Sequence, residues 1–370
     1  MRVPNTDFQI IISQFRFEGE FIRAEPYGSG HINDTYAAYF LKADGGTLRY
    51  ILHRINHFVF KKPEELMANI SAVTAHLRRK IIQAGGNPDR ETLTLIPAQH
   101  GDDFILTRSG EYWRAYHFIE NANTYLIPKS TQHVYHAARA YGKFQEMLRD
   151  FPAAQLHETI PDFHNTVQRF ETFVRVIKED PCNRVREVKK EIDFVLQRAD
   201  QTSILVDLID QGRLPIRVTH NDTKFNNVMI DDETGEGICV IDLDTVMPGS
   251  LLYDFGDAIR SIANTAAEDE RDISNVNLSL ETFENYTQGY LDTTLDTLTQ
   301  TEIQHLAFSA ILMTLECGLR FLGDYIAGDI YFRTTRQHHN LDRCRTQLKL
   351  VKEMEEKLEM MEQIIRKNID

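Results

Sequence analysis

The sequence predicts an α+β protein with two lobes, a small antiparallel sheet with one helix in residues 1–120 and a larger, mainly helical lobe in residues 121–370. Runs rich in β-branched and aromatic residues dominate the first part, and helical spacing of apolar residues dominates the second. No linker rich in Pro, Gly or Ser separates the two parts. The lobes are therefore expected to share one body.

The first lobe is expected to hold a three-stranded antiparallel meander followed by a helix. Turn residues at Gly28-Ser29-Gly30 and at 43–46 divide its strands, and Pro63 suits the first turn of the helix. The expected elements, in order, are a short helix near 7–15, the meander within 21–56, a helix over 63–83, apolar runs at 93–96 and 104–107, and a strand over 112–119.

The second lobe is expected to alternate helices with a few short strands. Its expected elements are helices near 130–149, 162–179 and 184–211, strands at 216–219, 228–230 and 238–241, and further helices from about 278 to the end. The last helix, about 341–369, carries an apolar stripe that either packs on its own lobe or forms a dimerising coiled coil. A monomer and a homodimer both remain open.

Composition limits the partners and the compartment. The 370 residues include 55 acidic and 41 basic side chains, for a net charge of −14, so the chain lacks the basic field that binds nucleic acid or anionic membranes. The longest uncharged stretch, 303–315, is shorter than the roughly 18 apolar residues of a membrane span. Four scattered cysteines and no signal-like N-terminus predict a cytoplasmic protein.

The segment 218–230 carries the most informative motif. His220, Asp222 and Asn227 have the H-x-D-x-x-x-x-N spacing of phosphoryl-transfer catalytic loops. A loose, metaphosphate-like transition state needs positioning and charge neutralisation, so Asp222 can accept the proton of an attacking hydroxyl while Lys224 places a cation near the phosphoryl group. The plain alternative is a polar hairpin in which Asn and Asp form turns. Asp254 and Asp257 are expected to brace this loop by hydrogen bonds.

A metal site is expected next to the catalytic loop. The apolar strand 238–241 ends in Asp242-Leu243-Asp244, which adds carboxylates to the amide of Asn227. Oxygen ligands of this kind suit a hard cation such as Mg²⁺. Asp244 could be a second metal ligand or a structural carboxylate.

A nucleotide-phosphate site is expected in the first lobe. Gly28, Ser29 and Gly30 stand between two strands, where backbone N–H groups can fold over phosphates, although a plain hairpin turn would look the same. In the third strand, Arg54 occupies the place of a phosphate-binding lysine, and Glu64 or Glu65 of the next helix is expected to pair with it. Arg54 as a surface residue is the alternative.

The chain resembles the aminoglycoside phosphotransferase and choline kinase family, which has a protein-kinase-like fold, and within it the N-acetylhexosamine 1-kinases. The motifs behind this resemblance, besides the phosphate loop, are ILHRIN, THNDTKFNNVM, CVIDLDTVMPG and LYDFGDAIR, and they span nearly the full length. The resemblance implies ATP- and Mg²⁺-dependent transfer of the γ-phosphoryl group to the anomeric hydroxyl of GlcNAc or GalNAc. It implies that Asp222 is the base, that Asn227 and Asp242 hold magnesium, and that 28–30 bind the nucleotide.

The resemblance also implies a sugar site in the segment 317–332, with Arg320 and Tyr331 as hexosamine contacts. From the residues alone, Arg320 could equally form a buried ion pair with Asp244 or Asp254. Arg54 departs from the wider family's usual lysine, and Asp242-Leu243-Asp244 departs from D-F-G. A kinase for choline, an amino alcohol or another sugar remains open, as does a non-catalytic nucleotide-binding protein.

Overall fold

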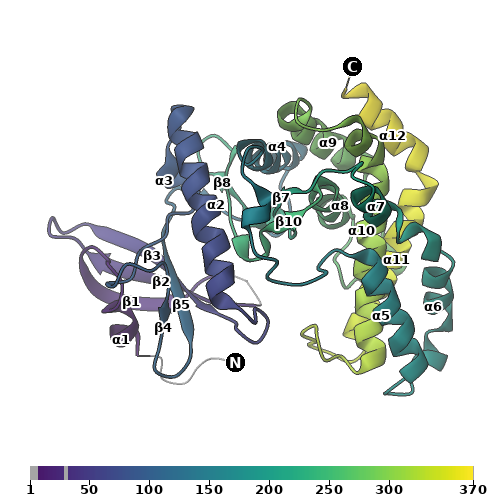
Figure 1. The fold of residues 1–370 in the computed structure, drawn as a ribbon, viewed down its shortest axis with the longest axis horizontal. Helices are drawn as coiled ribbons and strands as arrows, with labels where there is room; N and C mark the ends of the chain where they lie inside the picture. The colour runs from purple at the N-terminus through teal and green to yellow at the C-terminus, as the bar shows by residue number, and fades with distance from the viewer. Residues whose placement is uncertain (1–6, 29–31, 370) are drawn as a thin grey trace.

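The computed structural model describes residues 7–28 and 32–369, which form two lobes (Figure 1). The first lobe is built on one antiparallel sheet in the order β1-β2-β3-β5-β4, which contains the predicted meander. Its elements are α1 (Phe8–Ile12), β1 (Glu20–Pro26), β2 (Asp34–Leu41), β3 (Thr47–Ile55), α2 (Pro63–Gln83), α3 (Pro88–Glu91), β4 (Ile105–Leu106) and β5 (Tyr112–His117).

The two faces of this sheet have different neighbours. On one face, Leu52 and Trp113 pack with the residues of α1, and on the other, Ile55 and Tyr116 join the core that continues into the larger lobe. Since successive strand residues point to opposite faces, His53 of β3 faces the larger lobe and the next residue, Arg54, faces away from it. This alternation decides which side chains of the sheet point toward the larger lobe.

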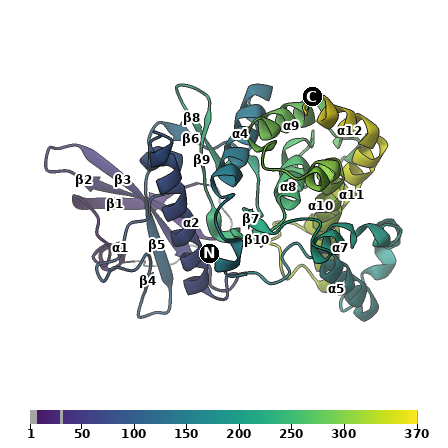
Figure 2. The same ribbon diagram turned by 45° about the horizontal axis from the view of Figure 1, so that its top comes forward.

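Helix α2 lies between the sheet and the larger lobe in both views (Figures 1 and 2). Toward the larger lobe, the buried Asn69 amide donates to the carbonyls of His157 and Val246, at 2.8 and 3.0 Å, and Lys80 pairs with Asp150 at 2.5 Å. On its other side, α2 is bonded to residues of the first lobe: Ser71 donates to Asp103, Arg78 donates to Thr94, and Glu64 accepts from Tyr112. The helix therefore ties the two lobes together.

The larger lobe is mainly helical. Its elements are β6 (Ala122–Asn123), α4 (Thr131–Met147), α5 (Thr166–Glu179), α6 (Lys189–Leu196), α7 (Ile204–Asp210), β7 (Arg217–Thr219), β8 (Val228–Asp231), β9 (Gly237–Val240), β10 (Met247–Gly249), α8 (Leu251–Ile262), α9 (Leu280–Thr294), α10 (Gln300–Ala327), α11 (His339–Glu356) and α12 (Leu358–Lys367). The short strands form two small sheets, β10-β7 and β6-β8-β9. These results confirm the predicted fold class.

Three helix predictions for this lobe need correction. The segment 184–211 is not one helix, because side-chain bonds to the backbone interrupt it: Arg198 donates to the Phe194 carbonyl and Thr202 to the Ala199 carbonyl. The C-terminal helix is broken at Lys357 into α11 and α12. Helix α8, which begins at the N-cap Ser250, was not predicted; it is buried on nearly every side, and its polar face, with Asp254, Asp257 and Arg260, is turned inward.

Helix α10 is the central helix of the larger lobe. A capping box of Thr299 and Glu302 starts it, and Gly328, with φ of 105°, ends it. By length and composition α10 could cross a membrane, but 78% of its apolar window is buried inside the protein, as in any core helix. The apolar stripe of α11 is buried against α10, so the C-terminal region packs on its own lobe.

Replacing Asn69 should weaken the attachment of α2. In Asn69→Ala, the carbonyls of His157 and Val246 and the N–H of His157 lose their buried partner, which should lower the free energy of unfolding by about 2–3 kcal/mol in urea titrations. Asn285→Ala, also inside a helix but exposed, controls for helix propensity and should change it by less than about 1 kcal/mol. Equal values for both variants would contradict this account of α2.

Candidate active site

The loop between β7 and β8 is shaped by a carboxylate buried behind it. Asp254 of α8 is 1% exposed, and its two oxygens accept from the backbone N–H groups of His220 and Asn221, at 2.9 and 2.7 Å. Gln145 donates to the same carboxylate at 2.8 Å. Asn221 has φ of 63°, a left-handed conformation that these bonds help to hold. Asp254 therefore fixes the backbone of the loop immediately before Asp222.

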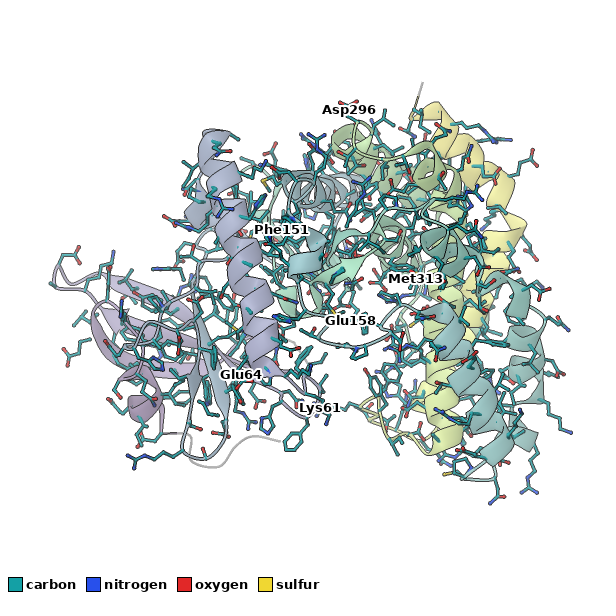
Figure 3. All side chains as sticks on the ribbon, in the orientation of Figure 1. Lys61, Glu64, Phe151, Glu158, Asp296 and Met313 are labelled. Atoms are coloured by element: carbon teal, nitrogen blue, oxygen red, sulfur yellow. The ribbon has the colours of Figure 1, made fainter. Side chains whose placement is uncertain are left out.

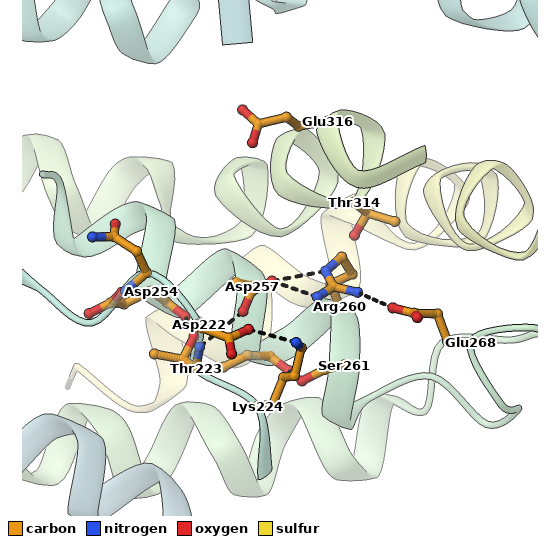
Figure 4. Close-up of polar contacts among 12 residues, drawn as sticks. Asp222, Thr223, Lys224, Asp254, Asp257, Arg260, Ser261, Glu268, Thr314 and Glu316 are labelled. Carbon is orange, nitrogen blue, oxygen red and sulfur yellow. Dashed lines mark hydrogen bonds and ion pairs between the residues drawn. The ribbon is translucent and has the colours of Figure 1, made fainter. Parts of the chain in front are cut away.

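A second carboxylate of α8 holds the other side of the loop. Asp257 accepts from the Thr223 N–H at 3.0 Å and forms a buried ion pair with Arg260 at 2.7 Å (Figure 4). Burial alone would raise the pKa of Asp257, but the positive charges of Arg260 and Lys224 lower it, so this carboxylate stays ionised. The prediction that Asp254 and Asp257 brace the loop is confirmed.

Asp222 and Lys224 point toward one another at the end of the loop (Figure 4). Lys224 Nζ lies 2.7 Å from Asp222 Oδ1, and the Asp222 side chain is 26% exposed, so a small hydroxyl compound can reach it. The negative charge of Asp222 raises the pKa of Lys224, which keeps this ammonium group protonated. The structure thus places a carboxylate and a cation side by side in the cleft, as the motif predicted.

Asn227 and Asp242 lie near this pair. Their side-chain oxygen atoms have no hydrogen-bond partner among the described residues. The Asn227 amide nitrogen donates to the Asp222 carbonyl at 2.8 Å and to Asp222 Oδ2 at 3.2 Å, which leaves Asn227 Oδ1 free. Asp242 has φ of 59°, and its side chain forms no hydrogen bond within the described part of the chain. The surrounding protein and the negative charges of Asp244 and Asp222 raise the pKa of Asp242 to about 7.

This donor set fits a divalent cation, because bound positive charge would relieve the repulsion among the carboxylates. In the described residues, no group of three or more His, Cys, Asp and Glu side chains could hold a metal ion by itself. Asn227 and Asp242 would therefore share the ion with oxygen atoms of a ligand.

Asp244 is used differently, as the partner of an arginine from the other lobe. Arg114 of β5 lies 2.5 Å from Asp244, and the two side chains are 1% and 4% exposed. Asn33, just before β2, donates to the same carboxylate at 2.6 Å. Of the two roles left open for Asp244, these contacts support the structural one.

His53 completes this connection between the lobes. Its Nδ1 accepts from Arg114 Nη2 at 3.0 Å, and burial together with the positive charge of Arg114 lowers the pKa of His53 to about 3. The imidazole is therefore neutral and can accept the bond without repelling the guanidinium. The residue of β3 that faces the larger lobe is His53, and the cation there comes from β5.

The predicted ion pair between Arg54 and Glu64 or Glu65 is wrong. Arg54 instead pairs with Asp34 and with Glu111, the latter at 3.0 Å, on the face of the sheet that points away from the larger lobe. Glu65 binds Lys62 at 2.9 Å, and Glu64, at the end of α2 in Figure 3, accepts from Tyr112 at 2.7 Å. A role of Arg54 in phosphate binding stays a prediction that this orientation does not favour.

The glycine loop can be described only in part. Gly28 has φ of 76° with open space around it, as a phosphate-cradling turn requires. Ser29 and Gly30 lie outside the described residues. Their predicted contact with a nucleotide therefore stays a prediction.

Arg320 and Tyr331 come together in a pocket of the larger lobe, as the resemblance implied. The pocket lies between α5, α10 and the segment 330–332, with a volume of about 200 Å³. The Arg320 guanidinium carbon lies 6.0 Å from the centre of the Tyr331 ring and 5.3 Å from that of Phe163. Asp244 and Asp254 have other partners, so neither of the suggested ion pairs with Arg320 is formed.

This pocket is connected to the catalytic loop through a buried histidine. His164 Nε2 contacts the Asn221 carbonyl at 3.3 Å, while His164 Nδ1 contacts Glu316 of α10 at 2.8 Å. Arg320 follows Glu316 by four residues, about 6 Å along the axis. A chain of contacts thus connects the backbone of the catalytic loop with the helix that carries Arg320.

Sequence reasoning missed Arg114, Asn33 and the His164–Glu316 pair. The only signal for Arg114 was its place among aromatic residues in the strand 112–119, which marks a buried position where an arginine needs a carboxylate. Asn33 and His164 carried no signal, because their partners are far away in the sequence.

The buried pair should be coupled strongly. Arg114→Met and Asp244→Asn should each lower the free energy of unfolding by about 3–5 kcal/mol, because each leaves a buried group without its partner. The double variant should lose less than the sum of the two, and urea titrations without nucleotide or metal measure this. The same cycle on the exposed pair Lys352 and Glu356 should give a coupling below about 1 kcal/mol. Additive losses at Arg114 and Asp244 would contradict the structural role of Asp244.

Comparison with known proteins agrees with this fold. An aminoglycoside phosphotransferase from Alicyclobacillus acidocaldarius subsp. acidocaldarius is similar with a TM-score of 0.66 at 11% identity, over 99% of this chain and 98% of that one. An amicoumacin kinase in complex with AMP-PNP and Ca²⁺ is similar with a TM-score of 0.58 at 14% identity, over 95% and 94%. A Plasmodium vivax ethanolamine kinase has a TM-score of 0.51 at 14% identity, over 87% and 80%.

These structures share the fold of a small sheet lobe and a larger helical lobe, as predicted. The model of the phosphotransferase enzyme family matches residues 23–287, which is most of the chain. The protein therefore belongs to the phosphotransferase enzyme family.

Proposed function

We propose that this protein is an ATP-dependent kinase that phosphorylates the anomeric hydroxyl of an N-acetylhexosamine, GlcNAc or GalNAc, with Mg²⁺ as the metal. The main support is one spatial relation: the pocket of Arg320 and Tyr331 lies one helical turn from the Glu316–His164 contact to the catalytic loop. The proposed acceptor lies between the catalytic loop and this pocket. Such an acceptor places one hydroxyl at Asp222 and its other substituents in the pocket.

In the proposed reaction, Asp222 orients the acceptor hydroxyl and takes up its proton. The acceptor oxygen forms a bond to the γ-phosphorus as the bond from that phosphorus to the bridging oxygen of ADP breaks. Lys224 stays protonated beside Asp222 and donates to the transferring phosphoryl group. A divalent cation held by Asn227 and Asp242 would neutralise charge on the nucleotide phosphates. Arg114 keeps Asp244 from adding a second free negative charge to this part of the site.

A kinase for a cationic acceptor is the second candidate, because an ethanolamine kinase has the same fold. The charge of the pocket argues against it. Arg169 and Arg320 both line the pocket and would repel the ammonium group of choline, ethanolamine or an aminoglycoside. A neutral sugar meets no such repulsion, and its hydroxyl and carbonyl oxygens can accept from both guanidinium groups.

A panel of acceptors tests the substrate. ADP release should be fastest with GlcNAc or GalNAc, slower with glucose and galactose, and absent with choline and homoserine. Phosphorus NMR of the product should show a phosphate on the anomeric oxygen. Turnover with choline alone would refute the sugar assignment, and no turnover with any acceptor would favour a non-catalytic nucleotide-binding protein.

Removing the base should stop transfer but not folding. In Asp222→Asn the amide cannot accept the proton, so kcat should fall at least about a hundredfold with little change in nucleotide binding, measured by calorimetry. Asp296→Asn, at an exposed aspartate away from the cleft (Figure 3), should keep full activity. A kcat for Asp222→Asn close to that of the unmodified protein would show that another group is the base.

A further inference from the structure

The pocket of the larger lobe contains two arginines that form no ion pair with a carboxylate among the described residues. Among the described residues, every other arginine that is buried or half-buried contacts a carboxylate within 4.0 Å. Arg169 and Arg320 are half-buried and form no ion pair there. In a chain of net charge −14, with acidic side chains in excess, this is an unusual arrangement.

The two guanidinium groups keep most of their hydrogen-bond donors free. Arg169 uses Nε and Nη2 on the carbonyl of Phe163, at 3.2 and 3.1 Å, and leaves Nη1 available. The Arg320 guanidinium carbon lies 5.3 to 6.0 Å from the rings of Phe163, Phe332 and Tyr331, and its side chain makes no hydrogen bond among the described residues. Ring faces stabilise a cation without occupying its N–H groups. Burial and the positive charge of Arg320 lower the pKa of Arg169, so an anion between them would relieve their repulsion.

The segment 330–332, which lines the pocket beside these arginines, is held in place by hydrogen bonds to Asp324. Asp324 accepts from the backbone N–H groups of Ile330, Tyr331 and Phe332, at 2.8 to 3.0 Å, and from the amide of Asn340. With all these donors, the Asp324 carboxylate holds the segment 330–332 and forms no ion pair with Arg320. The pocket is therefore shaped before any ligand enters it.

We propose that Arg169 and Arg320 together bind a carboxylate on the acceptor, so that an N-acetylhexosamine derivative that carries a carboxylate is a better acceptor than GlcNAc or GalNAc itself. This inference rests on the proposed function for the identity of the acceptor as a sugar. The carboxylate is attached away from the anomeric carbon, since the two arginines line the pocket with residues of α5, α10 and the segment 330–332 and not with residues of the catalytic loop.

A singly charged group fits this pocket better than a phosphate. Glu316 and Asp324 stand one turn before and one turn after Arg320 on the same helix, and both are buried carboxylates. Burial alone would raise the pKa of Glu316, but His164 and Arg320 lower it, so this negative charge persists. The formal charges of the two arginines and the two carboxylates cancel, so the pocket offers free N–H donors without a strong positive field, which suits a single carboxylate better than a dianion.

Binding of matched sugars tests the proposal. GlcNAc is compared by calorimetry with N-acetylglucosaminuronic acid, which carries a carboxylate at C6, and with 3-O-carboxymethyl-GlcNAc, which carries one on O3. At least one acidic sugar should bind the unmodified protein about tenfold or more tightly than GlcNAc, as charge-assisted hydrogen bonds give. This preference should shrink at high salt, a result that needs no variant.

Variants then assign the preference to the two arginines. Arg169→Gln and Arg320→Gln should each remove about tenfold or more of the affinity for the acidic sugar, and Arg169→Lys should retain part of it. Arg175→Gln, an exposed arginine on the same helix as Arg169, should keep the full preference. The proposal is overturned if neither acidic sugar binds more tightly than GlcNAc, or if the preference survives in both glutamine variants.

Turnover measurements separate this proposal from the proposed function. If GlcNAc is phosphorylated at C1 and the acidic sugars show no advantage in binding or kcat/KM, the kinase assignment stands and the carboxylate site is refuted. If the acidic sugars bind through Arg169 and Arg320 but no sugar is phosphorylated, the site is supported and the sugar kinase assignment is refuted.

Discussion

The shape of the catalytic loop depends on two carboxylates that are buried behind it. Asp254 and Asp257 lie on α8 behind the catalytic loop and together accept three of its backbone N–H groups. A loop of this kind has no helix or sheet ladder to satisfy its N–H groups, so buried acceptors must do so. This is why the left-handed backbone at Asn221 is tolerated and why Asp222 and Lys224 project into the cleft together. The chemistry of the loop is thus a consequence of the packing of α8.

The contact between the lobes also depends on a buried carboxylate, that of Asp244, which is paired with an arginine. Arg114 and Asn33 from the first lobe meet Asp244 from the second. The segment before β2, strand β5 and the end of β9 therefore converge on one carboxylate. Asp242, two residues earlier, is left as the free carboxylate of the cleft. One strand end thus supplies both a connection between lobes and a candidate metal ligand, which a simple count of aspartates could not separate.

Local sequence patterns were sufficient for the parts of the site that lie on one short segment. The spacing of His220, Asp222 and Asn227 identified the loop, and the strand before Asp242 identified the second group of ligands. Arg54 was misassigned because the face of a strand residue depends on the register of β3 with β2 and β5, which one segment does not reveal.

The remaining misses also have physical reasons. Helix α8 was missed although its polar residues recur at helical spacing, because Asp254, Asp257 and Arg260 were considered only as partners of the catalytic loop and not as one face of a helix. The break within 184–211 depends on side-chain bonds such as that of Thr202, which compete with helical bonds without a distinctive pattern. Arg320 was expected in one site with Tyr331. That it forms no ion pair among the described residues depends on three-dimensional packing, which the sequence does not show.

Helix α2 has a mechanical consequence for the two lobes. It is twenty-one residues long and is bonded on one side to the larger lobe, through Asn69 and Lys80, and on the other to the first lobe, through Ser71 and Arg78. Such a helix restricts the movement of the two lobes relative to each other. The chain crossing near residue 120 is therefore not a free hinge, and rotating one lobe against the other stretches bonds spread over several turns of α2.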